Sequence, residues 1–150
     1  MPKQREKAVA ANIAQRHNRY TYIKKSVYND IIDHSKKELP LEACGILSGK
    51  NGRCDTAWPM ENIERSPNSF AISNKDLQQA FKSITLQKEA FTGIYHSHPT
   101  AAPFPSKEDI THHIYPEVVY FIVSLRRRTP LVRCFQIKEY KVYPLKIITV

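Results

Sequence analysis

Two histidines, a serine and an aspartate lie close together in the stretch GIYHSHPTAAPFPSKED, which runs from Gly93 to Asp109. His96 and His98 follow an apolar run that predicts a β-strand, and residues two apart on a strand point to the same face. Their Cα atoms are expected about 6.5–7 Å apart, so both imidazoles can reach one ion at about 2.0–2.1 Å. Pro99 ends the strand because it cannot donate a ladder hydrogen bond. The spacing therefore predicts a metal site.

A third ligand is expected from Asp109, in the first turn of a short helix that the sequence predicts to start at Ser106. Two histidines and one carboxylate leave the fourth position of a tetrahedral zinc site open. An open position is typical of catalytic zinc, since structural sites are closed by protein ligands. Water at that position would have its pKa lowered towards about 7. We therefore expect one zinc ion per chain, held by His96, His98 and Asp109.

A hydrolytic site also needs a base and a group that stabilises a developing oxyanion. The Ser106 hydroxyl can donate to an oxyanion, and Glu42, just before the apolar segment ACGILSG, is the candidate base. Each residue has a simpler explanation: S-x-x-D is an ordinary helix-capping pattern, and Glu42 alone could be a surface residue near a proline. Cys44 is an alternative fourth ligand, although a thiolate there would exclude the water.

The remaining pattern indicates a sheet with helices packed on it, an α/β or α+β fold. Ser26 is predicted to cap a helix that ends before Pro40, and Ser73 a second helix that continues to about Glu89. Asn51-Gly52 is a hairpin turn signal. Helical spacing places Leu77, Ala80, Phe81 and Ile84 in the core. The predicted strands are residues 20–25, 43–49, 54–60, 70–73, 91–99, 117–125, 131–137 and 140–150.

Length and composition fit one soluble domain. The 150 residues carry 23 Lys or Arg against 14 Asp or Glu, a net charge of +9, which suggests an acidic partner without choosing among nucleic acid, a membrane surface and a protein. Residues 1–19 form a basic extension whose pattern does not resemble a DNA-binding motif. No apolar run is long enough to span a membrane. The three scattered cysteines argue against a disulfide framework and favour the cytoplasm.

These motifs together resemble the JAMM (MPN+) family of zinc metalloproteases, in the small single-domain form of bacteria and archaea. The family pattern of Glu, H-x-H, S and D reads here as Glu42, His96, His98, Ser106 and Asp109, with no departure in spacing. The resemblance implies a cytidine-deaminase-like JAMM/MPN fold over residues 20–150, with a mixed central sheet flanked by helices. It also implies that the two histidines and the aspartate bind zinc, that the glutamate is the general base and that the serine stabilises the tetrahedral intermediate.

The resemblance further implies a substrate and its groove. Related members hydrolyse the bond after the C-terminal Gly-Gly of ubiquitin-like or sulfur-carrier proteins, as peptidases or isopeptidases. Trp58 and Met60 lie in a segment that borders the substrate groove in the family, although core packing explains them equally well. Which carrier and which leaving group are used, and the oligomeric state, are not determined by the sequence; a homodimer is only the commonest case.

Two other functions are compatible with the same fold. A non-catalytic MPN scaffold would bind proteins only, but such members typically lose a ligand or the glutamate, and this chain keeps all five residues. A bacterial branch associated with DNA repair typically carries H-N-H-P, whereas this chain carries H-S-H-P. We therefore expect a zinc hydrolase with a protein substrate rather than a nucleic-acid partner.

Overall fold

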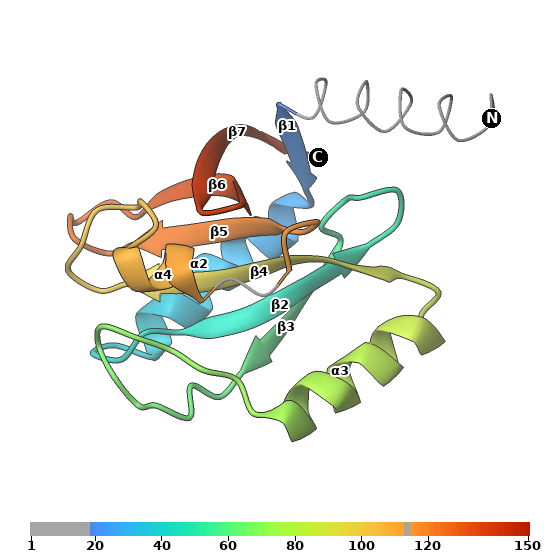
Figure 1. Cartoon of the computed structure of the whole chain (residues 1–150), viewed down its shortest axis with the longest axis horizontal. Coiled ribbons are helices and arrows are strands. Elements are labelled where there is room, and N and C mark those ends of the chain that lie inside the picture. Colours follow the sequence, from blue (N-terminus) through green and yellow to red (C-terminus); the bar gives the residue numbers. More distant parts are fainter. Residues whose placement is uncertain (1–18, 113–114) are drawn as a thin grey trace.

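The computed structural model describes residues 19–112 and 115–150, in which seven strands form one mixed sheet (Figure 1). The strand order is β1-β7-β6-β5-β4-β2-β3, with the pairs β1–β7 and β4–β5 parallel and the others antiparallel. The strands are β1 (Tyr20–Ile23), β2 (Cys44–Gly49), β3 (Thr56–Met60), β4 (Ala90–His98), β5 (Val119–Ser124), β6 (Leu131–Lys138) and β7 (Lys141–Thr149). The helices are α2 (Lys25–Lys37), α3 (Asn74–Leu86) and α4 (Lys107–Thr111).

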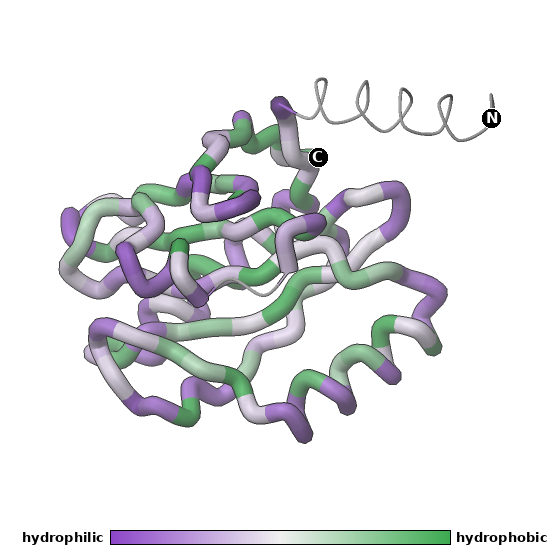
Figure 2. The backbone as a smooth tube through the Cα atoms, in the orientation of Figure 1, coloured by the Kyte–Doolittle hydropathy of each residue, from purple (hydrophilic) through white to green (hydrophobic). Residues whose placement is uncertain are grey.

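Each face of the sheet has its own hydrophobic cluster, so the fold has three layers. Val27 and Ile31 of α2 pack with Tyr95 and Phe121 on one face. On the other face, Ala80 and Ile84 of α3 pack with apolar residues of the central strands, and the half-buried Leu77 and Phe81 join them. The tube in Figure 2 is hydrophobic along the central strands and alternates along α3, as expected for a helix that buries one side. The predicted core face of this helix is confirmed.

Alternation along β4 separates the two layers residue by residue. Tyr95 points to the α2 face, whereas Ile94 belongs to the cluster under α3. His96 and His98 share the face of Ile94 because a strand repeats every two residues. Both histidines lie at the C-terminal end of β4, and their rings approach Asp109 in the first turn of α4.

Two sequence predictions about these elements need correction. Residues 70–73 are not a strand, because Asn62 and Ile63 hydrogen-bond with Ala71 and hold this segment as a loop. Ser26 does not cap α2, because the helix already starts at Lys25. Lys24 is at the N-cap position, and its side chain makes no capping hydrogen bond. The Lys24 amide donates to the Cys54 carbonyl and the Lys25 amide to the Val150 carbonyl, so tertiary contacts satisfy the first two amides at the helix start, which have no partner within the helix.

The remaining helix and turn predictions agree more closely with the structure. Ser73 caps α3 by accepting from the Asp76 amide, although the helix ends at Leu86 rather than near Glu89. Asn51 and Gly52 both have positive φ, at 56° and 76°, as the predicted hairpin turn requires. The basic extension predicted for residues 1–19 falls almost wholly outside the described residues, so the domain boundary stays a prediction. Within the part that the structure describes, no helix is both long and apolar enough to cross a membrane.

Candidate metal centre

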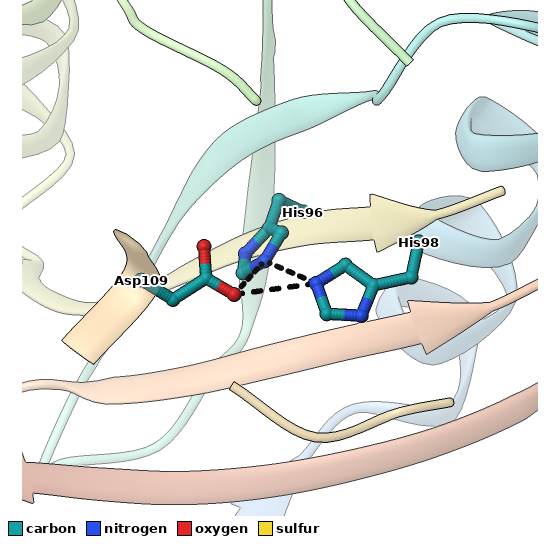
Figure 3. A group of neighbouring side chains, drawn as sticks. All are labelled: His96, His98 and Asp109. Atoms are coloured by element: carbon teal, nitrogen blue, oxygen red, sulfur yellow. Dashed lines mark hydrogen bonds and ion pairs between the residues drawn. The ribbon is translucent and has the colours of Figure 1, made fainter. Parts of the chain in front are cut away.

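The structure brings the three predicted ligands together from β4 and α4 (Figure 3). His96 Nε2 lies 3.1 Å from His98 Nε2 and 3.1 Å from Asp109 Oδ2, and His98 Nε2 lies 3.2 Å from the same oxygen. Ligand atoms around tetrahedral zinc are expected about 3.3 Å apart, given bonds of about 2.0–2.1 Å. The triangle of ligand atoms therefore fits one zinc ion with little movement.

The hydrogen bonds around the triangle orient its members for ligation. The Ala102 carbonyl lies 2.8 Å from His98 Nδ1, which must carry the proton to donate. In the neutral ring this leaves a lone pair on Nε2 for a metal, whereas the protonated ring also donates from Nε2 to Asp109. The Ser106 amide donates to Asp109 Oδ2 at 2.8 Å, and the Asp109 amide donates to Ser106 Oγ at 3.0 Å. This capping box fixes the aspartate on the helix start. Asp109 can therefore serve both in the capping box and as a metal ligand.

The electrostatics of the triangle keep Asp109 ionised. Burial alone would raise the pKa of this carboxyl, but hydrogen bonds from His96 and His98 outweigh it and hold the pKa well below the usual range. Burial has the opposite effect on His98 and would lower its pKa, but the hydrogen bond to Asp109 raises the pKa above the usual value. An ionised oxygen beside two imidazoles is a donor set that zinc accepts.

Glu42 lies next to this group but has the opposite ionisation behaviour. It is 4% exposed, and its Oε1 is buried without a hydrogen-bond partner among the described residues. Burial raises the pKa of this carboxyl to about 8, while the charge of His98 acts against the shift. A carboxyl that can gain or lose a proton near neutral pH is suited to general acid–base catalysis. The role of Glu42 as the general base stays a prediction.

The other candidates lie around the triangle rather than in it. Ser106 is exposed, and because its oxygen accepts from the Asp109 amide, its hydroxyl hydrogen can still be donated. Cys44 is outside the convergent ligand group, its thiol lies 3.9 Å from the Met60 carbonyl, and burial raises the thiol pKa to about 12. Trp58 and Met60 pack against the cluster under α3, and the Trp58 indole donates to Ser48 Oγ.

A cavity of about 490 Å³ opens beside His96 and Asp109. Its walls are mainly apolar and include Phe70, Ile72, Leu77 and Ile94, whereas Glu64 and Glu108 bring negative charge to it. Phe70 also stacks on the His96 ring, with centroids 4.6 Å apart and planes inclined by 25°. Neither Trp58 nor Met60 is among the residues that line this cavity. An extended apolar or glycine-rich segment could lie here beside the candidate ligands His96 and Asp109.

Sequence reasoning missed three residues that shape the site. Phe70 lies in the segment predicted as a strand, and neither Asn62 nor Ser97 is marked by a motif. Ser97 points away from the two histidines, and its hydroxyl accepts from the Ala43 amide at 2.8 Å. The irregular segment around S-P-N-S signals a loop, but nothing local in it shows which residue the loop packs against.

Comparison with known proteins identifies the family. Residues 24–138 match the family of prokaryotic homologs of the JAB domain. The chain belongs to this family. A CysO-cysteine peptidase of Mycobacterium tuberculosis is 31% identical over 106 residues, which cover 69% of this chain and 73% of that protein. The desampylase of Haloferax volcanii is 29% identical over 103 residues, covering 64% of this chain and 74% of the relative.

Solved structures agree with the JAB assignment. The solution structure of a Desulfitobacterium hafniense protein matches with a TM-score of 0.79 at 29% identity, covering 87% of this chain and 92% of that one. A JAB1/MPN domain protein from Archaeoglobus fulgidus matches with a TM-score of 0.58 at 18% identity, covering 85% and 99%. At this identity the second match shows the fold alone. The predicted mixed sheet flanked by helices, of the JAB/MPN type, is confirmed.

Proposed function

We propose that this JAB protein is a zinc-dependent peptidase or isopeptidase that hydrolyses the amide bond after the C-terminal Gly-Gly of a sulfur-carrier or ubiquitin-like protein. The observation that carries the proposal is the triangle of His96, His98 and Asp109 ligand atoms, 3.1–3.2 Å apart, beside a buried carboxyl. Three protein ligands of this kind leave one position for the reaction, as catalytic zinc requires. Such a zinc ion would lower the pKa of water and polarise the scissile carbonyl.

The side chains divide the proton transfers and charge stabilisation among them. Glu42 takes a proton from the attacking water as the oxygen bonds to the carbonyl carbon, and returns it to the amine when the C–N bond breaks. Ser106 donates its hydroxyl hydrogen to the oxyanion that forms in between. Burial of Glu42 supports this role, because its pKa of about 8 allows both directions of transfer near neutral pH.

The substrate class rests on the relatives and on the cavity. One relative is named for a cysteine conjugate of CysO and another is a desampylase, and a carrier–cysteine conjugate is our first choice, with a ubiquitin-like conjugate second. A Gly-Gly tail is thin enough to pass the apolar cavity beside His96 and to pair as an added strand. The net charge of +9 is compatible with an acidic carrier body. Trp58 and Met60 remain proposed tail contacts.

The first test is the zinc content of the purified, untagged protein beside His98→Ala. We expect about one zinc per chain, lost in His98→Ala and retained in His112→Ala, whose exposed imidazole is outside the ligand triangle. Carrier–cysteine and carrier–lysine conjugates with intact Gly-Gly tails then serve as substrates, and conjugates with an Ala-Ala tail are the control. Absence of zinc, even after its addition, would leave a binding module in place of the hydrolase.

A further inference from the structure

No hydrogen bond among the described residues orients the carboxyl group of Glu42. Its Oε1 is buried without a hydrogen-bond partner in the described part of the chain, so the direction of the side chain depends on how its backbone is fixed. One side of that backbone is fixed by β4: the Ala43 amide donates to Ser97 Oγ at 2.8 Å, and the Ser97 amide donates to the Ala43 carbonyl at 3.0 Å. Since Ser97 lies between the two histidines, this pair of bonds ties residue 43 to the metal-binding strand.

The other side is fixed by the loop between β3 and α3. The side-chain amide of Asn62 donates to the Glu42 carbonyl at 3.0 Å. The Glu42 amide in turn donates to the Ser66 carbonyl at 2.9 Å, inside the same loop. The amide and the carbonyl of Glu42 are therefore both hydrogen-bonded to the loop that contains Asn62 and Ser66.

Asn62 holds this loop from within. Its Nδ2 also donates to the Ser69 carbonyl at 3.0 Å, and its Oδ1 accepts from the amides of Glu64 and Ala71 at 3.1 and 3.2 Å. A primary amide has two donor hydrogens and an oxygen with two lone pairs, which matches this set of carbonyls and amides. The side chain is 8% exposed, so water does not replace these bonds readily. The same loop carries Phe70 onto the His96 ring.

We propose that Asn62 is a positioning residue, which sets Glu42 and the Phe70 ring relative to the metal ligands by bonding the Glu42 carbonyl and the loop through one amide. It touches neither substrate nor metal, and its effect on turnover rests on the proposed function. Because displacement of a catalytic group by about 1 Å can cost about 10²-fold in rate, loss of the amide should lower kcat while zinc binding is unaffected. The zinc ligands come from β4 and α4, which Asn62 does not contact among the described hydrogen bonds.

The test compares Asn62→Ala with Asn62→Asp in the zinc-loaded full chain. Asp keeps the acceptor for the Glu64 and Ala71 amides but cannot donate to the Glu42 carbonyl when ionised. Both variants should lower kcat by about 10- to 100-fold with zinc Kd within twofold of wild type. Amide hydrogen exchange by NMR should become faster at Glu42 in both variants, and at Glu64 and Ala71 in Asn62→Ala only.

Asn68→Ala and Asn68→Asp are matched controls, because Asn68 is exposed in the same loop and its side chain makes none of these bonds. Both controls should match wild type in kcat and exchange. Unchanged kcat in either Asn62 variant, or Glu42 exchange equal to wild type, would overturn the proposal. If wild type cleaves no conjugate, the exchange measurement still decides whether Asn62 fixes Glu42. That result would count against the proposed function alone.

Discussion

The surroundings of two carboxyl groups at the candidate metal centre shift their pKa values in opposite directions. Asp109 receives hydrogen bonds from His96 and His98 that outweigh its burial and hold its pKa below the usual range. Glu42 is buried without such donors, and its pKa rises to about 8. A ligand must be ionised, whereas a base must exchange its proton near the working pH. At the scale of single residues, the environment therefore separates the proposed metal ligand from the proposed base.

Replacing Glu42 tests this division of roles. Glu42→Gln should keep about one zinc per chain, because Glu42 is outside the ligand triangle, and should lower turnover by about 10²–10⁴-fold because a general base is lost. Zinc is measured by metal analysis and turnover with the carrier conjugate. Glu61→Gln, at an exposed position after β3, is the control and should behave as wild type. Loss of zinc in Glu42→Gln would instead place Glu42 among the ligands.

Ser106 has two roles that a matched variant can separate. Ser106→Ala should lower kcat by about 10²–10³-fold if the hydroxyl serves the oxyanion, and should also cost about 1 kcal/mol of stability as a lost cap. Ser73→Ala removes a comparable cap from α3, where Ser73 accepts from the Asp76 amide at 3.1 Å, and should lower stability without lowering kcat. Equal kcat in Ser106→Ala and wild type would restrict Ser106 to capping.

At the scale of elements, the sequence predicts what depends on local spacing. The two-residue period of His96 and His98, and the capping pattern of Ser106 and Asp109, each lie within one element and its start. All seven strands of the sheet were expected, because alternating or continuous apolar runs mark them. The contact of Asn62 with Glu42 joins segments twenty residues apart, and no local pattern encodes it. The predicted strand at 70–73 was wrong for the same reason, since side-chain bonds from Asn62 decide its conformation.

The contact between β2 and β4 leads to a stability prediction. A Cβ at Gly45 would lie 2.4–2.5 Å from the ring of Tyr95, which is fully buried and bonded to His34 through its hydroxyl at 2.8 Å. Gly45→Ala should therefore lower the free energy of unfolding by about 1–3 kcal/mol, as overpacking does. Urea unfolding measures this loss. In the Tyr95→Leu background, which lacks the ring at the clash, Gly45→Ala should cost less; an equal cost in both backgrounds would contradict the assigned clash.

At the scale of the whole molecule, the candidate metal site and the hydrophobic cluster under α2 are on opposite faces of the sheet. The proposed metal ligands and the cavity share the side of α3 and α4, where Glu64 and Glu108 make the cavity acidic although the chain is basic overall. The α2 side holds Cys54 and Cys134 in a continuous apolar cluster. All three cysteines are free and buried. The three thiols therefore serve as packing groups.

These buried thiols make stability sensitive to alkaline pH. Burial raises the pKa of Cys54 to about 11 and that of Cys44 to about 12, and burial raises the pKa of Cys134 well above its usual value. The folded state keeps thiol protons that the unfolded state, with a pKa of about 8.5, has lost. Since the folded state then binds more protons, the free energy of unfolding falls as pH rises from about 8.5 towards about 11, and is unaffected by the thiols below that window.

The expected slope is about 1.4 kcal/mol per pH unit for each thiol, and about 4 kcal/mol for three. Urea unfolding between pH 7.5 and 10, with reductant and a chelator to remove metal linkage, measures this slope. Cys54→Ala should reduce this slope by about a third, because that thiol no longer ionises; the packing lost at this buried position lowers stability equally at every pH and leaves the slope below pH 8 unchanged. A free energy of unfolding that stays flat to pH 10 would mean that water reaches these thiols in the folded protein, contrary to the burial of all three.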